Sequence, residues 1–320
     1  MIKAGIIGGA GYTAGELLRL LINHPETEVA WIHSTSNAGA PVTDIHEGLI
    51  GDTDLVFSSD FDLSAVDVVF LCQGHGFSAR FWEENTLPEG VKVIDLAQDF
   101  RDESEGYVYG LPEVAAEAIG KASKVANPGC FATAIQLALL PLAAAGKLNG
   151  EVHLTGITGS TGAGVKPSAT THFSWRNNNI SVYKAFRHQH LKEIGRTLAK
   201  YSDGKEPVIN FVPIRGDFPR GIFVTAYIDT PLSEQEARDI YADFYDGAPF
   251  THFSEKPVDL KQVVNTNKCV VSVEKHGSKL LILAAIDNLL KGASGQAVQN
   301  MNLMFGLPEK TGLSLKPSAF

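Results

Sequence analysis

Cysteines and long hydrophobic runs are scarce in this sequence. Only three cysteines occur in 320 residues, and a small, odd number argues against a disulfide framework and for a reducing compartment. No apolar run approaches the roughly 18 residues that a membrane-spanning helix requires, and the longest candidate, residues 137–145, is interrupted by Pro141. No secretory leader precedes the first strand-like run. We therefore expect a cytoplasmic protein that contacts no membrane.

Positive charge is also in short supply. The chain has 27 basic and 36 acidic side chains, a formal net charge of −9. Nucleic-acid binding requires a basic face for the phosphates, so we expect no nucleic-acid partner. Hydrophobic residues make up 44% of the chain, which is typical of a folded globular protein. The length favours two domains.

The first 150 residues alternate short apolar runs with amphipathic segments. This alternation predicts a parallel sheet with helices on both faces, which is a Rossmann-type doubly wound α/β domain. The strands are expected at residues 2–7, 29–33, 66–71, 91–95 and 124–126, and the helices at 13–23, 77–85 and 131–145.

The pattern changes after Gly150, where strands dominate. We expect strands at residues 151–158, 208–213, 221–228, 268–274 and 279–286, and helices at 189–201, 233–245 and 295–305. The helix at 233–245 opens with a capping box, Ser233 to Glu236. So many strands with so few helices predict a second, α+β domain with a mixed or antiparallel sheet.

A glycine-rich loop, Gly8 to Gly15, separates the first strand from the first helix. Gly9, Gly11 and Ala14 fit the pattern G-x-G-x-x-A, in which glycine lets the backbone approach a pyrophosphate at a helix N-terminus. An ordinary strand-to-helix turn is the alternative. The position at the start of the chain favours dinucleotide binding.

The end of the second strand bears on which dinucleotide is bound. Enzymes that use NAD place an acid there to hold the ribose hydroxyls, whereas this strand ends in HSTSN (33–37) and the next acid is Asp44. The pattern favours NADP. Because no Lys or Arg occurs between Arg19 and Arg80, a 2′-phosphate would rest on hydroxyls, backbone N–H groups, His33 or a cation distant in sequence.

Cys130 follows a Pro-Gly turn and opens a helix. The positive end of a helix lowers the pKa of a thiol placed there, and a thiolate attacks carbonyl carbons. The alternative is a buried structural cysteine, which suits Cys72 and Cys269 because both border apolar strands. For Cys130 both interpretations stay open on this evidence.

His188, His190 and Glu193 follow later in the chain. On a helix His190 and Glu193 share a face, and a carboxylate orients an imidazole and raises its pKa. This pair predicts a general acid/base, with an exposed ion pair as the alternative. A metal site is also open, but no further Cys or His has a suitable spacing nearby, so we expect no metal.

A second glycine-rich loop, residues 159–164, follows a strand and either cradles substrate through Ser160 and Gly162 or is a flexible turn. Cations gather in the same domain, which favours an anionic substrate, although most are expected to be solvated. We take Arg187 as the substrate-binding candidate. The cations are Lys166, Arg176, Lys184, Arg187, Arg215 and Arg220.

Together these segments resemble the N-acyl-γ-glutamyl-phosphate reductases of arginine biosynthesis, relatives of the aspartate-semialdehyde dehydrogenases. The matching stretches run in order over nearly the whole chain. They are GGAGYTAGELLRLL (8–21), STSNAG (34–39), VIDLAQDFR (93–101), YGLPE (109–113), NPGCFAT (127–133), GSTGAG (159–164), HQHLKEI (188–194) and AIDNLLKGASGQAVQNMNLMFGL (285–307). The family commonly has Arg where Thr35 stands.

The resemblance implies a role for each matching residue. Cys130 is the nucleophile, His190 the acid/base and Glu193 its support. The cofactor residues are Gly8, Gly11, Tyr12, Thr13, Gly15, Ser34, Ser36 and Asn288. It also implies a Rossmann domain from residues 1–129 and 288–320, and an inserted catalytic domain, 130–287, that makes the contacts of a homo-oligomer, a dimer or a tetramer.

The implied reaction reduces an N-acyl-glutamyl 5-phosphate, N-acetyl or N-succinyl, to the 5-semialdehyde through a cysteine thioester, with NADPH as the reductant. An aspartate-semialdehyde dehydrogenase would share the loop, the cysteine and the histidine. A non-catalytic NADP-binding sensor and a metal hydrolase that uses His188 and His190 are the alternatives from other classes.

Overall fold

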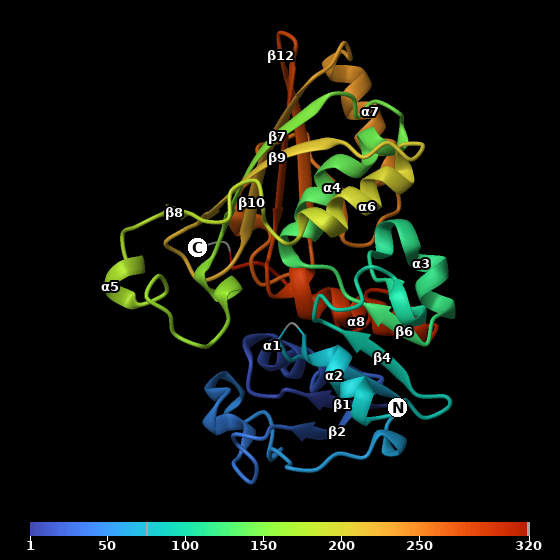
Figure 1. Ribbon diagram of the computed structural model, residues 1–320, viewed down its shortest axis with the longest axis vertical. Helices are drawn as coiled ribbons and strands as arrows, with labels where there is room; N and C mark the ends of the chain where they lie inside the picture. Colours follow the sequence, from blue (N-terminus) through green and yellow to red (C-terminus); the bar gives the residue numbers. More distant parts are fainter. Residues whose placement is uncertain (75, 319–320) are drawn as a thin grey trace. The chain divides into compact units, whose positions relative to one another are not determined.

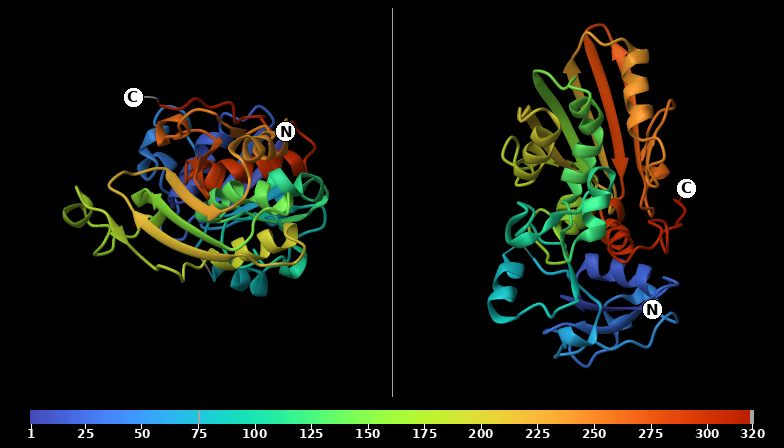
Figure 2. Two further views of the ribbon diagram at one scale, coloured as in Figure 1. Left: turned by 90° about the horizontal axis from the view of Figure 1, so that it is seen from above. Right: turned by 90° about the vertical axis from the view of Figure 1, so that its right-hand side faces the viewer.

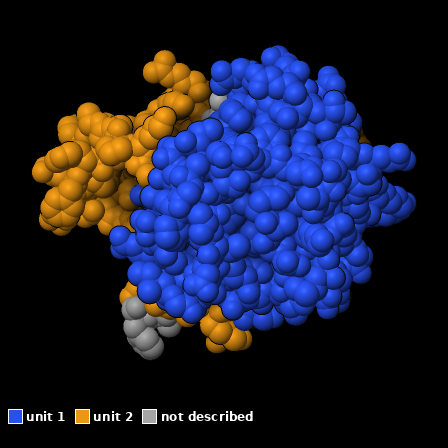
Figure 3. Space-filling view, turned by 90° about the horizontal axis from the view of Figure 1, so that it is seen from below, with its two compact units in different colours: residues 1–129, 293–314 blue, residues 130–292, 315–320 orange. Residues whose placement is uncertain are grey.

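The computed structural model describes residues 1–74 and 76–318. The chain divides into two compact units. Unit 1 comprises Met1–Gly129 and Ala293–Ser314, and unit 2 comprises Cys130–Gly292 and the end of the chain from Leu315 (Figure 3). The first unit is therefore discontinuous, and the second is inserted into it.

A parallel sheet of six strands, in the order β2-β1-β3-β4-β6-β5, forms the centre of unit 1 (Figure 1). The predicted Rossmann-type class is confirmed. The strands are β1 (Ile2–Ile7), β2 (Thr27–His33), β3 (Val68–Leu71), β4 (Lys92–Asp95), β5 (Val108–Tyr109) and β6 (Lys124–Ala126). The helices are α1 (Tyr12–Leu21), α2 (Phe77–Glu84), α3 (Pro112–Lys121) and α8 (Gly295–Met304).

The returning helix α8 is tied to unit 1 by side-chain amides. It packs on α1 and α3. The amide of Asn300 donates to the carbonyl of Gly110 at 3.0 Å, and the Asn302 Oδ1 lies 3.0 Å from Nε2 of His24. Buried amides are costly unless they are hydrogen-bonded, so these residues fix the docking of α8.

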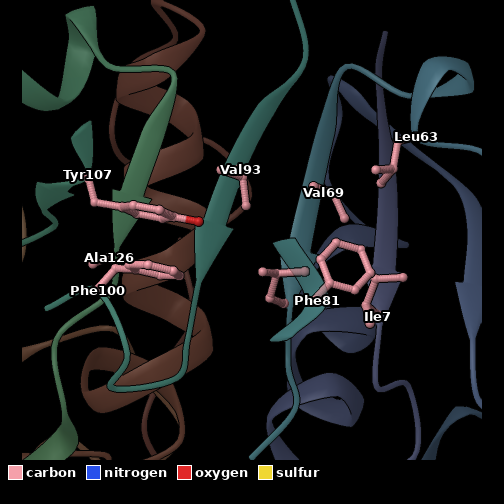
Figure 4. Close-up of a cluster of buried hydrophobic side chains, with 9 residues drawn as sticks. Ile7, Leu63, Val69, Phe81, Val93, Phe100, Tyr107 and Ala126 are labelled. Carbon is pink, nitrogen blue, oxygen red and sulfur yellow. The ribbon is translucent and has the colours of Figure 1, made fainter. Parts of the chain in front are cut away.

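One hydrophobic core cluster of unit 1 lies between the sheet and α2. Figure 4 shows Phe81 close to Ile7 and Val69, and Phe100 alongside Tyr107. The rings of Phe100 and Tyr107 stack with centroids 4.4 Å apart. The indole N–H of Trp82 donates to the Tyr107 hydroxyl at 2.8 Å. The cluster includes Ile7, the last residue of β1, and so anchors the strand that leads into the glycine-rich loop.

A mixed sheet of seven strands, in the order β11-β12-β13-β10-β7-β9-β8, forms unit 2. The β7–β9 and β11–β12 pairs are parallel and the others are antiparallel. The strands are β7 (Glu151–Thr158), β8 (Ser181–Val182), β9 (Val208–Arg215), β10 (Ile222–Asp229), β11 (Thr251–Phe253), β12 (Cys269–His276) and β13 (Lys279–Ile286). The helices are α4 (Cys130–Ala144), α5 (Phe173–Arg176), α6 (Leu191–Tyr201) and α7 (Glu234–Phe244).

Helix α4 is the central helix of unit 2. It lies against β10, β12 and β13, and α6 and α7 pack on it (Figure 2). Its residues from Phe131 to Ala143 are all buried, as expected for a helix that is apolar on every side. The hydroxyls of Tyr241 and Tyr245 donate to the carbonyls of Ala138 and Leu137, both at 2.5 Å. This helix therefore holds its first residue, Cys130, on a rigid support.

The sequence predicted most of the long elements and missed one helix of ordinary length and several short elements. The capping box of Ser233 and Glu236 is present at α7. The pattern missed α3, α5, β5, β8 and β11, which have between two and ten residues. Two-residue strands carry no alternation to detect. Across the described residues, no helix has the length and hydropathy to cross a lipid bilayer.

Candidate active site

Cys130 is the first residue of α4, as the sequence predicted, and its side chain is partly exposed. Gly292 lies directly beside it: a Cβ built on Gly292 would come within 2.8 Å of the Cys130 Cβ. Any larger residue at position 292 would displace the cysteine. Cys130 is at the N-terminal end of α4, where backbone N–H groups and the helix dipole favour negative charge.

His190 and Glu193 form a buried pair at the start of α6. His190 occupies the N-cap position, and its Nε2 lies 3.9 Å from Oε1 of Glu193. The exposed fractions of the two side chains are 7% and 6%. The alternative of an exposed ion pair is therefore wrong. A carboxylate with this little solvent around it holds an imidazole in one orientation.

An aromatic cluster in unit 2 links the starts of α4 and α6. The ring of His188 contacts Phe131, the neighbour of Cys130, at 5.5 Å between centroids and His190 at 4.6 Å. It also contacts Tyr183 at 5.8 Å and Phe211 at 5.6 Å. The cluster brings the segments of Cys130 and His190, 60 residues apart, into one site.

His188 itself is a structural member of this cluster. Burial lowers its pKa to about 4, with smaller contributions from Lys184 and Arg215. It is neutral at neutral pH, and its Nδ1 accepts the backbone N–H of His190 at 3.3 Å. His188 therefore positions His190. Among the described residues, no three His, Cys, Asp or Glu side chains gather as a metal ion would require.

Tyr183 is a site residue that the sequence analysis missed. Burial, and then the charge of Cys130, raise the pKa of Tyr183 to about 12. The phenol is thus protonated near the cysteine at neutral pH. No motif pointed to it, because Tyr183 precedes the His188 segment in an irregular loop with positive φ at Lys184 and Phe186.

The glycine loop 159–164 is held by backbone hydrogen bonds to the segment 218–221. The N–H groups of Gly159, Ser160 and Thr161 donate to carbonyls of residues 221, 218 and 219. These amides are occupied and offer no cradle. Ser160 and Gly162, predicted to contact substrate, lie in the short 3₁₀ helix η5 (Ser160–Ala163).

Asn288 holds this loop in place. Its Oδ1 accepts the N–H of Gly221 at 2.7 Å, and its Nδ2 donates to the Thr161 hydroxyl at 3.0 Å. Asn288 is 2% exposed and belongs to unit 2. Its amide is thus committed within unit 2, although the resemblance placed it at the cofactor.

The cations of unit 2 divide into several kinds. Arg220 pairs with buried Asp287 at 3.1 Å. Arg176 donates to the carbonyls of Thr170, Asn179 and Arg215. The side chains of Lys166, Lys184 and Arg187, the last our substrate candidate, are exposed. Arg215 is half-buried and lies over the ring of Tyr183 at 4.7 Å.

The nucleotide loop of unit 1 has the predicted strand–turn–helix form. Gly8 has a φ of +85°, and a Cβ there would come within 2.4 Å of Gln73, so only glycine fits. Gly11 is the N-cap of α1, where no described side chain caps the helix and no described heavy atom would crowd a Cβ. The first turn therefore presents uncapped N–H groups, with Tyr12 and Thr13 beginning the helix, and suits a pyrophosphate.

Gly15 serves packing within the loop. A Cβ on Gly15 would come within 2.6 Å of the His46 Nδ1, and the His46 Nε2 lies 2.7 Å from the Gly9 carbonyl. His46 thus packs against the loop and stabilises it. Gly15, one residue after the motif's third position at Ala14, is therefore needed for this close packing.

Ser34 and Ser36 follow β2 and are joined by one amide. The Asn37 Nδ2 lies 3.3 Å from the Ser34 Oγ and 2.8 Å from the Ser36 Oγ. Ser34 is buried and Ser36 is exposed. Asp60 lies close enough to His33 to affect its pKa, which burial lowers. Asp60, from a later segment, therefore lies near the end of β2, and the sequence analysis did not predict this.

The other two cysteines are structural in their surroundings. Cys269 is fully buried. Burial, and then the charge of Asp95, raise the pKa of the Cys72 thiol to about 12. Cys72 therefore remains a protonated thiol at neutral pH.

Comparisons with known proteins agree with this arrangement. A model of the semialdehyde dehydrogenase NAD binding domain matches residues 3–122, and a model of the semialdehyde dehydrogenase dimerisation domain matches residues 130–288. The N-acetyl-gamma-glutamyl-phosphate reductase of Bacteroides thetaiotaomicron is 59% identical, with 100% of both chains covered. That of Parabacteroides distasonis is 58% identical with the same coverage. The chain belongs to the N-acetyl-gamma-glutamyl-phosphate reductase family.

Solved structures show the same fold. Aspartate semialdehyde dehydrogenase II of Vibrio cholerae, complexed with ASA, has a TM-score of 0.76 at 18% identity and covers 96% of this chain and 98% of its own. The Candida albicans enzyme, solved with NADP, has a TM-score of 0.70 at 15% identity, with 95% and 98% covered. This member of the reductase family is an oxidoreductase whose first domain binds a nicotinamide cofactor.

Proposed function

We propose that this protein reduces an N-acyl-L-glutamyl 5-phosphate, N-acetyl or N-succinyl, to the 5-semialdehyde and phosphate with NADPH, in arginine biosynthesis. One observation carries the proposal: Cys130 and the buried His190–Glu193 pair begin two helices that pack on each other, joined by the ring of His188. A nucleophile and a proton donor in one unit suit acyl transfer through a thioester.

Cys130 opens the reaction. Its thiolate attacks the acyl carbon of the substrate, the bond from that carbon to the phosphate oxygen breaks, and phosphate leaves with the electron pair. The N–H groups of the first turn of α4 face the negative oxygen of the tetrahedral intermediate. The product of this half-reaction is a thioester on Cys130.

His190 acts as the general acid and base in the second half-reaction, the reduction of the thioester. The nicotinamide supplies hydride when bound. His190 donates a proton to the oxygen that becomes negative, and takes it back as the carbonyl re-forms and the Cys130 thiolate departs. Glu193 stabilises the charged imidazolium, and general acid/base help of this kind contributes about 10²–10⁴-fold.

NADP as the preferred cofactor is part of the proposal. The hydroxyls of Ser34 and Ser36 follow β2, where an NAD enzyme would carry an acid on the strand itself. Asp60, which lies close enough to His33 to act on its pKa, is a feature that opposes this assignment. The ratio of kcat/KM for NADPH to that for NADH tests this assignment, and a ratio at or below one contradicts it.

A homo-oligomer is proposed through the open face of the unit 2 sheet. Val224, Ala226 and Ile228 of β10 are buried, whereas Tyr227 on the opposite face is 44% exposed and stacks on His153. Light scattering tests this: Tyr227→Glu is expected to shift a dimer or tetramer toward monomer, and an unchanged mass contradicts the surface.

The deciding experiment is the reverse reaction. Phosphate-dependent reduction of NADP⁺ is measured with N-acetyl-glutamate semialdehyde, N-succinyl-glutamate semialdehyde and aspartate semialdehyde in parallel. Turnover with an acyl-glutamate semialdehyde supports the proposal and identifies the acyl group. Turnover with aspartate semialdehyde alone, or none with any of the three, overturns it.

A further inference from the structure

Arg215 is held rigidly at the end of β9. Its backbone pairs with Thr158 of β7 on one side and Ser181 of β8 on the other. Its carbonyl accepts a hydrogen bond from the Arg176 Nη1 at 2.8 Å. Three strands and a buried arginine thus fix where the Arg215 side chain begins.

Within the described residues, the guanidinium of Arg215 has no carboxylate partner, and it hydrogen-bonds to the side chain of Tyr183. It lies 4.7 Å over the ring of Tyr183, and its Nε is buried without a hydrogen-bond partner within the described chain. No ion pair joins Arg215 to a carboxylate among the described residues. A buried cationic donor left unpaired is costly, so such a group in a native protein requires an explanation.

The surroundings raise the local positive charge further. The sequence has no Asp or Glu between Glu151 and Glu193. Arg176 is close enough to Arg215 for their like charges to interact, and exposed Asp217, which accepts the Asn178 N–H at 2.6 Å, is the acid that acts on Arg176. By contrast, Arg220 is matched by Asp287. Excess positive charge at Arg215 therefore calls for an external anion.

Arg215 is also near the reacting groups of unit 2. Tyr183, beneath the guanidinium, contacts His188, which in turn contacts His190. The strand partner Thr158 leads directly into the loop 159–164. A ligand held by Arg215 would thus lie beside the site built from Cys130 and His190.

We infer that Arg215 binds an anionic group of the substrate. The inference rests on the proposed function, in which the acyl phosphate carries a phosphate and a carboxylate, and an N-succinyl group adds a second carboxylate. A guanidinium matches all of these with paired N–H donors. In each case the planar guanidinium would donate two N–H groups to two oxygens of the phosphate or carboxylate.

The test uses Arg215→Gln and Arg215→Lys in the reverse reaction, with Lys205→Gln as the matched control. Lys205 is an exposed cation of the same unit outside the site. In Arg215→Gln, loss of a charged hydrogen-bonding group is expected to raise the KM of the reactant that carries the bound anion about ten- to a hundredfold. Arg215→Lys, which keeps the charge but not the fork, is expected to lie between that variant and the wild type.

The substrates identify the anion. A raised KM for phosphate alone assigns Arg215 to the phosphate, and a raised KM for both acyl-glutamate semialdehydes assigns it to the shared carboxylate. A raised KM for the N-succinyl compound alone assigns it to the acyl carboxylate. Unchanged KM values for all of them, with or without a lower kcat, overturn the inference.

Two controls separate this inference from other failures. If the wild-type enzyme turns over none of these substrates, the proposed function fails before Arg215 is tested. If Arg215→Gln does not fold by circular dichroism, wild-type protein is labelled with phenylglyoxal and mapped by mass spectrometry. Protection of Arg215 by phosphate or by a turned-over semialdehyde supports the inference, and equal labelling with and without them overturns it.

Discussion

The Nε2 of His190 lies 3.9 Å from the Oε1 of Glu193, and both side chains are almost completely buried. A charged imidazole in such a place depends on its carboxylate, because little water is present to replace it. The pair lies at the start of α6, which packs on α4, the helix that begins at Cys130.

Glu193→Gln is expected to lower kcat about tenfold and to shift the limb of the pH–rate profile that reports the proton donor toward lower pH. The reason is that the amide no longer stabilises the imidazolium. The measurement is kcat against pH for wild type and variant. As a control, Lys205→Gln should keep the wild-type profile, and a Glu193→Gln profile that moves to higher pH would contradict the assignment.

Cys130→Ser is expected to reduce kcat by at least about a thousandfold, since a hydroxyl is a far weaker nucleophile than a thiolate. Iodoacetamide should label Cys130 before Cys72, whose pKa of about 12 keeps it protonated. Peptide mapping after brief alkylation measures the order. Near-normal turnover in the serine variant, or faster labelling of Cys72, would refute the nucleophile.

Thr35→Arg is expected to lower the KM for NADPH about tenfold and leave that for NADH unchanged. Thr35 is exposed just beyond β2, and a guanidinium there adds a charged hydrogen bond to a 2′-phosphate. Parallel kinetics with both cofactors measure the change. An equal effect on both KM values would place the ribose elsewhere.

Asp95 should make unit 1 less stable as the pH rises. Burial, with a smaller contribution from Asp99, raises its pKa to about 6 from 3.8. The folded state therefore binds a proton more tightly than the unfolded state. Its stabilising contribution is complete below about pH 4 and is lost as the pH passes about 6, a change of about 2–3 kcal/mol.

Asp95→Asn removes this titration and should flatten that part of the pH profile. The Ser78 hydroxyl and the Ala97 N–H, which both donate to the Asp95 Oδ1, can still donate to the amide oxygen. Urea unfolding between pH 4 and pH 8 measures the slope. Identical slopes for wild type and variant would contradict the raised pKa.

Asn288→Ala is expected to destabilise unit 2 by about 1–3 kcal/mol, because the buried Gly221 N–H loses its acceptor. Freed from Asn288, the loop 159–164 should also become mobile, and hydrogen exchange at Thr161 measures this directly. Unchanged protection there would show that the bonds to residues 218–221 suffice alone.

Much of the fold could be predicted from the sequence because its elements are long and periodic. The runs Ile2–Ile7 and Glu151–Thr158 were predicted with the residues that the structure gives them. Helix α4 was predicted within one residue at each end. Short strands such as β5 and β8 form only because longer neighbours offer hydrogen bonds to them.

The amino-acid sequence by itself determined the glycine loop, the cysteine at a helix start and the His190–Glu193 spacing, since each depends on neighbours along the chain. Only the tertiary structure decided that Arg220 is paired with Asp287 whereas Arg215 lies over Tyr183 instead of a carboxylate, and that His188 is neutral. It also decided that Asp60 approaches His33, and that Asn288 serves the loop of unit 2. The physical reason is that partners, burial and charge are set by residues distant in sequence, which packing brings together.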